Sequence, residues 1–260
     1  MVSHFSSLKT NLGFEEVYSS RLKEINELIS FVASLDVVLL EKDDEPKTTV
    51  DSLFSDSYEF YSENNMVVPE YSVISSVLRS NIYLMIYNLI EYTVTSLLQS
   101  LYDLLKTSGC TYSDVSDELK ELWHHSQILV RMKDPNSKDS TILQISKYLL
   151  DKAINKSPLQ IDARNTMHGG NLDGEEIKKT FTKHGIHINT CNGSYRPDLL
   201  SAIREKRNNL AHGSISFYEA GRETTVSDLD SLLGIVSAFL SQLCSDVEFY
   251  IEGKQYLSAH

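Results

Sequence analysis

The stretch from Glu70 to Lys106 reads EYSVISSVLRSNIYLMIYNLIEYTVTSLLQSLYDLLK. Its apolar residues recur every three or four positions, which is the period of an α-helix. They cover so wide a face that the helix needs neighbours on several sides, as in the middle of a bundle. The stretch therefore predicts a long central helix over residues 70–106 and an all-α fold.

The rest of the chain adds helices around this one. Apolar residues keep a helical period in further segments, which we expect to be helices: 14–40, 113–130 (as one helix or two), 141–154, 173–184, 198–211 and a closing helix, capped by Thr225 or Ser227, that runs to about residue 256. Residues 41–70 and 155–172 interrupt the pattern, so we expect a long connection and an irregular loop there. Residues 214–222 are expected to form a short loop.

Composition sets limits on the class of protein. The chain has 41% hydrophobic and 23% charged residues, as ordinary soluble globular proteins do, and its 260 residues suffice for one large domain or two small ones. The net charge of −12 argues against an extended nucleic-acid-binding surface, because Lys and Arg make most phosphate contacts. Between Asp173 and His212, however, seven Lys or Arg residues outnumber five acidic ones. This mildly basic segment suits a short single strand of RNA, although solvated helix faces would have the same composition.

The cellular location follows from two further features. The cysteines Cys110, Cys191 and Cys244 are odd in number and far apart, which does not suggest a disulfide framework. The first residues, MVSHFSSLKTNLGF, lack the apolar core of a signal peptide, and no run reaches the roughly 18 apolar residues of a membrane span. We therefore expect a soluble, cytoplasmic protein that does not bind a membrane.

Chemically versatile residues concentrate in the segment RNNLAHG, residues 207–213. The guanidinium of Arg207 has planar donors that fit phosphate oxygens, and the imidazole of His212 can transfer protons near neutral pH. In an unbroken helix five positions correspond to about 140° of rotation, so the two side chains would lie on different faces. Gly213 is suited to end the helix, with His212 as its C-cap. The segment predicts a site for phosphodiester chemistry at a helix end.

The same residues resemble a known family. Arg207, four residues and His212 match the R-x4-6-H signature of the HEPN superfamily, with Asn208 at the polar position that usually follows the arginine. Three stretches are similar to a bacterial branch of HEPN-like nucleases: LRSNIYLMIYNLIEYTVTSLL (78–98), GNLDGEEIKKTFTKHGI (170–186) and RNNLAHGSISFYEAG (207–221). The likeness covers most of residues 71–250. It implies a single HEPN-type helical domain over residues 1–260, usually a homodimer, that cuts RNA without a metal or other cofactor in a toxin–antitoxin or phage-defence system.

The three residues of this motif then have definite roles. His212 would act as general base on a ribose 2′-hydroxyl, Arg207 would stabilise the charge on the attacked phosphate, and Asn208 would position either the histidine or the phosphate. The partners would be an RNA substrate, a second copy of the chain and an antitoxin or defence-system protein. Some toxins of this family carry a tyrosine two residues after the histidine, which their antitoxin modifies. Ser214 occupies that position here, so neutralisation by that modification is not expected.

The predicted central helix contributes candidate supporting residues. Asn81, Asn88 and Glu91 can share one stripe of it, from which Asn88 or Glu91 would orient the arginine or the histidine. Alternatively, these are hydrogen-bonded polar groups within a core or a dimer interface. Arg79 is expected to form a surface ion pair rather than a phosphate site.

A different class of function fits the same motif: a catalytically silent helical module that binds RNA, a nucleotide or another protein. In that reading Arg207 bonds an acid such as Glu91 at the helix end. His212 would then be a C-cap that satisfies the last carbonyl groups of the helix. Loss or retention of RNA cleavage on substitution distinguishes the two functions.

Two other patterns do not predict a site. His184, His187 and Cys191 have a spacing that a metal could use, but no fourth ligand follows, so we expect no metal. The glycines of HGGN (168–171) could cradle a phosphate, but no P-loop lysine follows and no strand precedes them. We expect this segment to be a loop.

Overall fold

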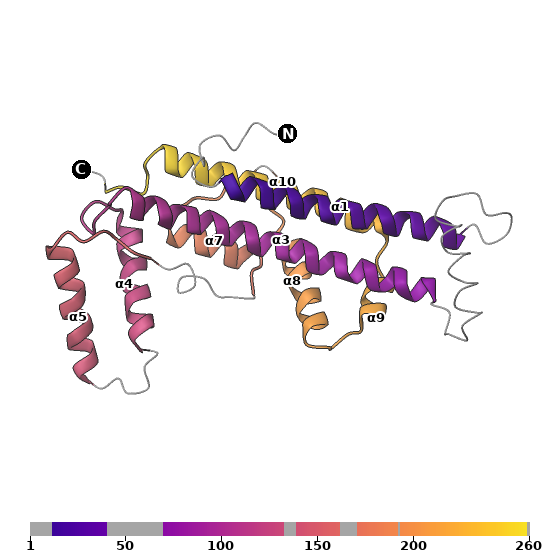
Figure 1. Cartoon of the computed structure of the whole chain (residues 1–260), viewed down its shortest axis with the longest axis horizontal. Coiled ribbons are helices and arrows are strands. Elements are labelled where there is room, and N and C mark those ends of the chain that lie inside the picture. Colours follow the sequence, from indigo (N-terminus) through magenta and orange to yellow (C-terminus); the bar gives the residue numbers. More distant parts are fainter. Residues whose placement is uncertain (1–11, 41–69, 133–138, 162–170, 192, 259–260) are drawn as a thin grey trace. The chain divides into compact units, whose positions relative to one another are not determined.

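The computed structural model describes residues 12–40, 70–132, 139–161, 171–191 and 193–258. Apart from two isolated β-bridges, all regular secondary structure in these ranges is helical, which confirms the all-α prediction. The helices of the described residues are α1 (Leu12–Leu40), α3 (Tyr71–Thr107), α4 (Asp117–Met132), α5 (Asp139–Ile154), α7 (Gly174–Lys183), α8 (Pro197–Ala211), α9 (Phe217–Arg222) and α10 (Val226–Glu252) (Figure 1).

The predicted helices match these closely, and 113–130 is the single helix α4. Helix α7 begins after Asp173, whose carboxylate accepts a hydrogen bond of 2.9 Å from the Glu176 N–H. Of the two candidate caps for the closing helix, Thr225 is the one used: its hydroxyl accepts from the Asp228 N–H at 3.1 Å. The helix ends at Glu252, earlier than predicted. Residues 41–69 and 162–170 lie outside the described residues, and 155–161 are irregular apart from a bridge at Pro158.

One prediction is wrong, because residues 214–222 are not all loop. Helix α9 begins after Ser216, whose hydroxyl accepts a hydrogen bond of 3.1 Å from the Glu219 N–H, while the Glu219 carboxylate accepts one from the Ser216 N–H, also at 3.1 Å. This reciprocal pair is a capping box, for which Ser-x-x-Glu is the sequence signature. The signal was present in the sequence, but six residues are too few to show a helical period.

The chain divides into two compact units. Unit 1 comprises residues 1–17, 90–201 and 237–260, and unit 2 comprises residues 18–89 and 202–236. Helices α3 and α10 contribute one half to each unit. The prediction of a single domain over 1–260 stays a prediction.

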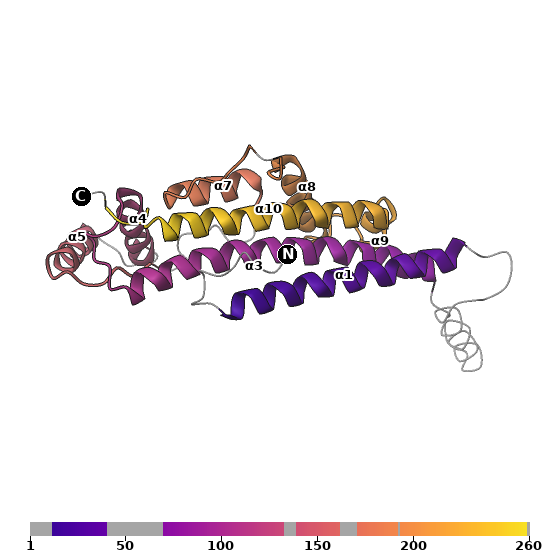
Figure 2. The same ribbon diagram turned by 90° about the horizontal axis from the view of Figure 1, so that it is seen from above.

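Unit 2 contains α9 and most of α1, with the first halves of α3 and α10 and the last part of α8. Helices α1 and α3 run side by side and antiparallel (Figure 1 and Figure 2): Arg21 near the start of α1 reaches the Asn88 carbonyl, and Asp36 near its end contacts Arg79. Their apolar faces form the core of the unit, together with buried residues of α8 and α10: Ile25, Ile29, Val32, Leu35, Ile82, Ile86, Ile203, Leu210, Leu229, Leu233 and Val236.

Unit 1 contains α4, α5 and α7, with the second halves of α3 and α10. The Tyr250 hydroxyl of α10 donates a hydrogen bond of 2.8 Å to the His184 carbonyl at the end of α7. The segment after α10 pairs with the connection between α3 and α4, through a bridge between Val115 and Leu257. Within the described ranges, two helices, α3 and α10, are long and apolar enough to cross a membrane, but core helices of soluble proteins also satisfy this criterion. Cytoplasmic location therefore stays a prediction.

Candidate active site

Of the predicted catalytic residues, Arg207 and Asn208 lie on α8 and His212 directly follows it, and the sequence of the helix explains how it is oriented. Pro197 occupies the first helical position, where a missing N–H costs no intrahelical bond. Leu200, Ile203 and Leu210 are buried, so they set which face of the helix points inward. The C-terminal part of α8, which contains Arg207 and leads to His212, is therefore held in a defined orientation.

The end of α8 is a Schellman motif, as the glycine predicted. Gly213 has a φ of +69°, in the left-handed region. Its N–H donates to the Leu210 carbonyl at 3.2 Å, and the Ser214 N–H donates to the Asn209 carbonyl at 2.9 Å. His212 is the C-cap, and its side chain is exposed. Because backbone N–H groups satisfy these two carbonyls, the imidazole is not needed for that purpose.

Arg207 lies half-buried on α8, above an aromatic ring of α3. Its guanidinium carbon is 4.7 Å from the centroid of the Tyr87 ring, a cation–π distance, and Tyr87 is itself fully buried. Nη1 donates a hydrogen bond of 2.9 Å to Oδ1 of Asn208. The backbone carbonyl of Asn208 in turn accepts the His212 N–H at 2.9 Å. Asn208 therefore connects the arginine and the histidine, through its side chain and its backbone respectively.

A second cation lies beside Arg207. The Lys206 ammonium is 4.3 Å from the centroid of the Tyr83 ring, one turn before Tyr87 on α3. Nζ also donates a hydrogen bond of 2.9 Å to Oγ1 of Thr224, in the connection between α9 and α10. Burial lowers the pKa of Lys206, and the nearby Glu223 carboxylate acts in the opposite direction.

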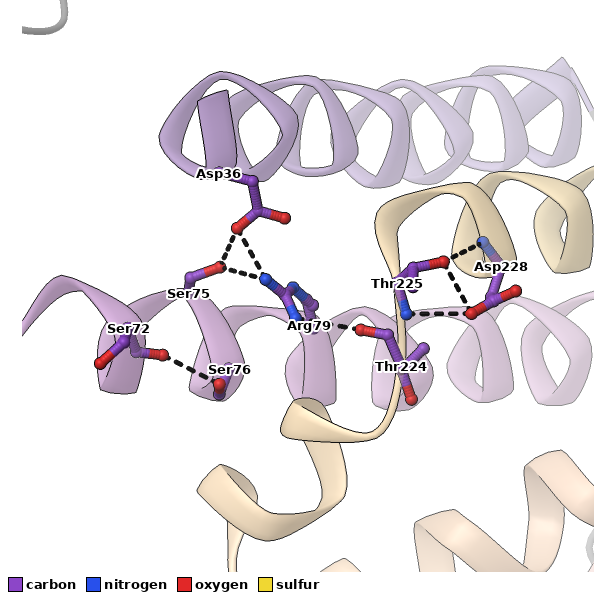
Figure 3. Close-up of polar contacts among 8 residues, drawn as sticks. All are labelled: Asp36, Ser72, Ser75, Ser76, Arg79, Thr224, Thr225 and Asp228. Carbon is purple, nitrogen blue, oxygen red and sulfur yellow. Dashed lines mark hydrogen bonds and ion pairs between the residues drawn. The ribbon is translucent and has the colours of Figure 1, made fainter. Parts of the chain in front are cut away.

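The connection that holds Lys206 is itself bound by Arg79 (Figure 3). Nη1 of Arg79 donates to the Thr224 carbonyl at 3.1 Å, and Nη2 donates to the Asp36 carboxylate at 2.7 Å and to the Ser75 hydroxyl at 3.0 Å. The side chains of Arg79 and Asp36 are only 17% and 24% exposed, so this ion pair is not the surface pair that the sequence suggested. It joins α1 and α3 to the segment before α10.

Helix α9 also packs directly on α3. A Cβ added to Gly221 would lie 1.7 Å from the carbonyl oxygen of Ser76 and 2.9 Å from the Ser80 hydroxyl oxygen. The Ser80 hydroxyl donates a hydrogen bond of 2.5 Å to the Phe217 carbonyl. Only glycine permits this approach, which fixes the start of the connection to Thr224.

The predicted supporting residues lie as follows. Asn88 is exposed on α3, and its backbone carbonyl accepts a hydrogen bond of 3.5 Å from the Arg21 guanidinium. Glu91 belongs to unit 1, just beyond the boundary between the units. Their roles stay predictions. Sequence reasoning missed Tyr83 and Tyr87, because tyrosines four residues apart in an apolar helix are typical of a core.

The possible metal ligands behave differently from one another. His184 is fully buried: Nδ1 is 2.7 Å from the Thr180 carbonyl oxygen, and Nε2 is hydrogen-bonded to the Tyr102 hydroxyl. Both ring nitrogens are thus engaged and unavailable to a metal. His187 and Cys191 are exposed. Among the described residues, no group of three or more His, Cys, Asp or Glu side chains could hold a metal ion.

Comparison with known proteins agrees with this architecture. A family model described as HEPN_MAE_28990-like HEPN matches residues 14–256, nearly the whole chain. Searches of curated proteins and of solved structures returned no match. The match includes all of α3, α8, α9 and α10, and every residue of unit 2 described above falls within it. The chain therefore belongs to the HEPN superfamily, in the HEPN_MAE_28990-like HEPN family.

Proposed function

We propose that this protein is a metal-independent endoribonuclease that leaves 2′,3′-cyclic phosphate ends. The observation that carries the proposal is the end of α8: the exposed His212 imidazole directly follows a helix in which Asn208 holds Arg207. Membership of the HEPN superfamily supports it, because nucleases are frequent there.

The reaction begins at the ribose. His212 takes the proton of a 2′-hydroxyl, and the resulting oxygen attacks the adjacent phosphorus. The bond between phosphorus and the 5′-oxygen breaks, which leaves a cyclic phosphate on one product and a 5′-hydroxyl on the other. Arg207 binds the non-bridging oxygens, on which negative charge increases, and Asn208 limits the orientation of the guanidinium. DNA is not cleaved, because it lacks the 2′-hydroxyl.

The departing 5′-oxygen needs a proton, and a single Arg207–His212 pair has no second acid in the motif. We propose that a homodimer supplies it, with two pairs across one cleft. Control of such an activity in the cell would fall to an antitoxin or a defence-system protein. The mild excess of Lys and Arg over residues 173–212 suits a short RNA strand better than an extended duplex.

The test is cleavage of an end-labelled single-stranded RNA in EDTA. We expect cyclic phosphate ends from the wild-type protein, and a loss of at least about a hundredfold in rate for His212→Ala, the magnitude typical of general-base removal. Arg207→Ala should lose activity comparably. His187→Ala, which removes an exposed histidine of unit 1, is the matched control and should be fully active.

The silent-module alternative makes the opposite prediction. Intact RNA at high concentrations of wild-type protein, over a panel that includes structured RNAs, would contradict the nuclease proposal. Cleavage that disappears in EDTA, or that survives in His212→Ala, would contradict the mechanism.

A further inference from the structure

Lys206 is a partly buried cation whose contacts in the structure are neutral. Its ammonium touches the Tyr83 ring and the Thr224 hydroxyl. Among the ion pairs of the described residues none involves Lys206, although Glu223 is near enough to influence its pKa. Burying a charge without a partner of opposite charge is unfavourable. The arrangement therefore favours an anion from outside the chain.

The position of Lys206 indicates which anion. Lys206 and Arg207 are consecutive on α8, and they lie over tyrosines one turn apart on α3. Positions four residues apart on a helix differ by about 6 Å in height. Successive phosphates along one nucleic-acid strand are separated on the same scale. The Tyr83 ring and the Thr224 hydroxyl hold the ammonium in place while it retains further N–H donors for a ligand.

We propose that Lys206 binds the RNA phosphate next to the one that Arg207 holds, so that the substrate is a single strand bound through at least two consecutive phosphates. This inference rests on the proposed nuclease function. A single strand is required because in-line attack by a 2′-hydroxyl needs backbone torsions that a regular duplex does not adopt. Lys206 contributes to binding, whereas the chemical step belongs to Arg207 and His212.

Binding is measured with the full chain carrying His212→Ala, so that the RNA stays intact. An eight-nucleotide single-stranded RNA is titrated at several salt concentrations. Each phosphate contact contributes about 0.7 to the slope of log K against log salt for a single strand. Adding Lys206→Gln should reduce the slope by about that amount and weaken binding roughly tenfold at low salt. Single-stranded DNA of the same sequence should show the same dependence, since it has the same phosphates.

Matched variants separate this role from a structural one. Lys206→Arg keeps the charge and should keep the wild-type salt slope. Lys206→Met keeps the aliphatic stem on Tyr83 but removes the charge, so its salt slope should fall as that of Lys206→Gln does. Lys23→Gln removes an exposed lysine of α1 in the same unit and should change nothing. In the active protein, Lys206→Gln should raise KM for the octamer with little change in kcat. A dinucleoside monophosphate has only one phosphate, so the rate of its cleavage should be the same for Lys206→Gln and for wild type.

The outcomes are distinct. If wild-type protein cleaves RNA but Lys206→Gln and Lys206→Met keep its salt slope and KM, the inference is overturned and the nuclease proposal stands. If Lys206→Arg loses as much as Lys206→Gln, Lys206 is structural and the inference is again overturned. If no RNA is cleaved while binding still depends on Lys206, the nuclease proposal fails and the phosphate contact remains. Absence of RNA binding by the wild-type chain overturns the inference as well.

Discussion

Two histidines occupy the same position in two similar helix ends, but His184 is buried and His212 is exposed. His184 and His212 are both C-caps followed by a glycine in the left-handed region, with φ of +77° for Gly185 and +69° for Gly213. The residue after that glycine is the buried Ile186 in one case and the exposed Ser214 in the other. A Schellman motif favours an apolar contact at this position. Ile186 thus draws the α7 end into the core, while the α8 end stays in solvent.

The pH dependence of stability should report the buried histidine. The pKa of His184 is lowered to about 4: burial is the main cause, the hydrogen bond to the Thr180 carbonyl opposes it, and the nearby Lys183 adds to the lowering. The unfolded chain has a histidine pKa near 6.5, so between these values only the unfolded state binds the proton. The stabilising contribution is therefore complete above about pH 6.5 and is lost as pH falls toward 4. We expect His184 to lower the free energy of unfolding by about 2 kcal/mol between pH 7 and pH 5.

Urea titrations at the two pH values measure this contribution as a difference between proteins. His184→Gln should lack the pH-dependent loss, although it is less stable overall. His187→Gln, at an exposed position, should show the wild-type dependence. Identical pH dependence in wild type and His184→Gln would contradict the assignment.

At the scale of elements, the long helix α3 and the short segment before α10 together hold Lys206 in place. The segment from Ser216 to Thr225 contains α9 and Thr224, and Thr224 contacts both Lys206 and Arg79. It is anchored to α3 through Gly221, where two backbones approach closely. The position of the Lys206 ammonium therefore depends in part on Gly221, which is not one of the proposed catalytic residues.

Substitution of two helical glycines should have opposite effects. The Cβ of Gly221→Ala would meet the backbone of Ser76, which cannot move aside, so α9 would be displaced and the free energy of unfolding should fall by about 1–3 kcal/mol. Gly234, in α10, has open space around it. Gly234→Ala should raise the free energy of unfolding by up to about 1 kcal/mol, because alanine favours a helix. Urea unfolding measures both, and a Gly221→Ala protein as stable as wild type would show that α9 does not pack as described.

At the scale of the whole molecule, the proposed reaction would require two copies of the chain. A cyclising cleavage needs a base for the 2′-hydroxyl and an acid for the 5′-oxygen, and we propose that the two come from His212 of two protomers. This arrangement ties activity to association. It also predicts that a dimer of one wild-type chain and one His212→Ala chain is inactive, because one of the two histidines is missing.

Subunit mixing tests the requirement for two histidines. Wild-type protein is exchanged with increasing amounts of His212→Ala, and the rate of RNA cleavage is followed. If both histidines of a dimer are needed, the rate per protomer falls as the square of the wild-type fraction, so a half-and-half mixture keeps about a quarter of the activity. Mixing with His187→Ala should leave the rate unchanged. A linear decline would mean that each protomer works alone.

The sequence by itself determined the local structure of this protein. Helical periods, the Asp173 and Thr225 caps and the Gly213 stop are all set by residues within about one turn of each other, so they could be read before the fold was known. The capping box of Ser216 and Glu219 was equally local, and α9 was missed only because it is short. The Arg207–Asn208–His212 motif is also local in sequence, so it and the family resemblance could be recognised without the structure.

Only the tertiary structure decided what faces this motif. Arg79 reaches a carbonyl 145 residues away, and Arg207 and Lys206 rest on tyrosines of a helix far earlier in the chain. Such pairs depend on how helix faces dock, which periodicity alone does not specify. From the sequence alone, the apolar helix that contains Tyr83 and Tyr87 is expected to be part of the core, and Lys206 is expected to be a solvated lysine. The contacts of Lys206 with Tyr83 and of Arg207 with Tyr87 follow only from the three-dimensional structure.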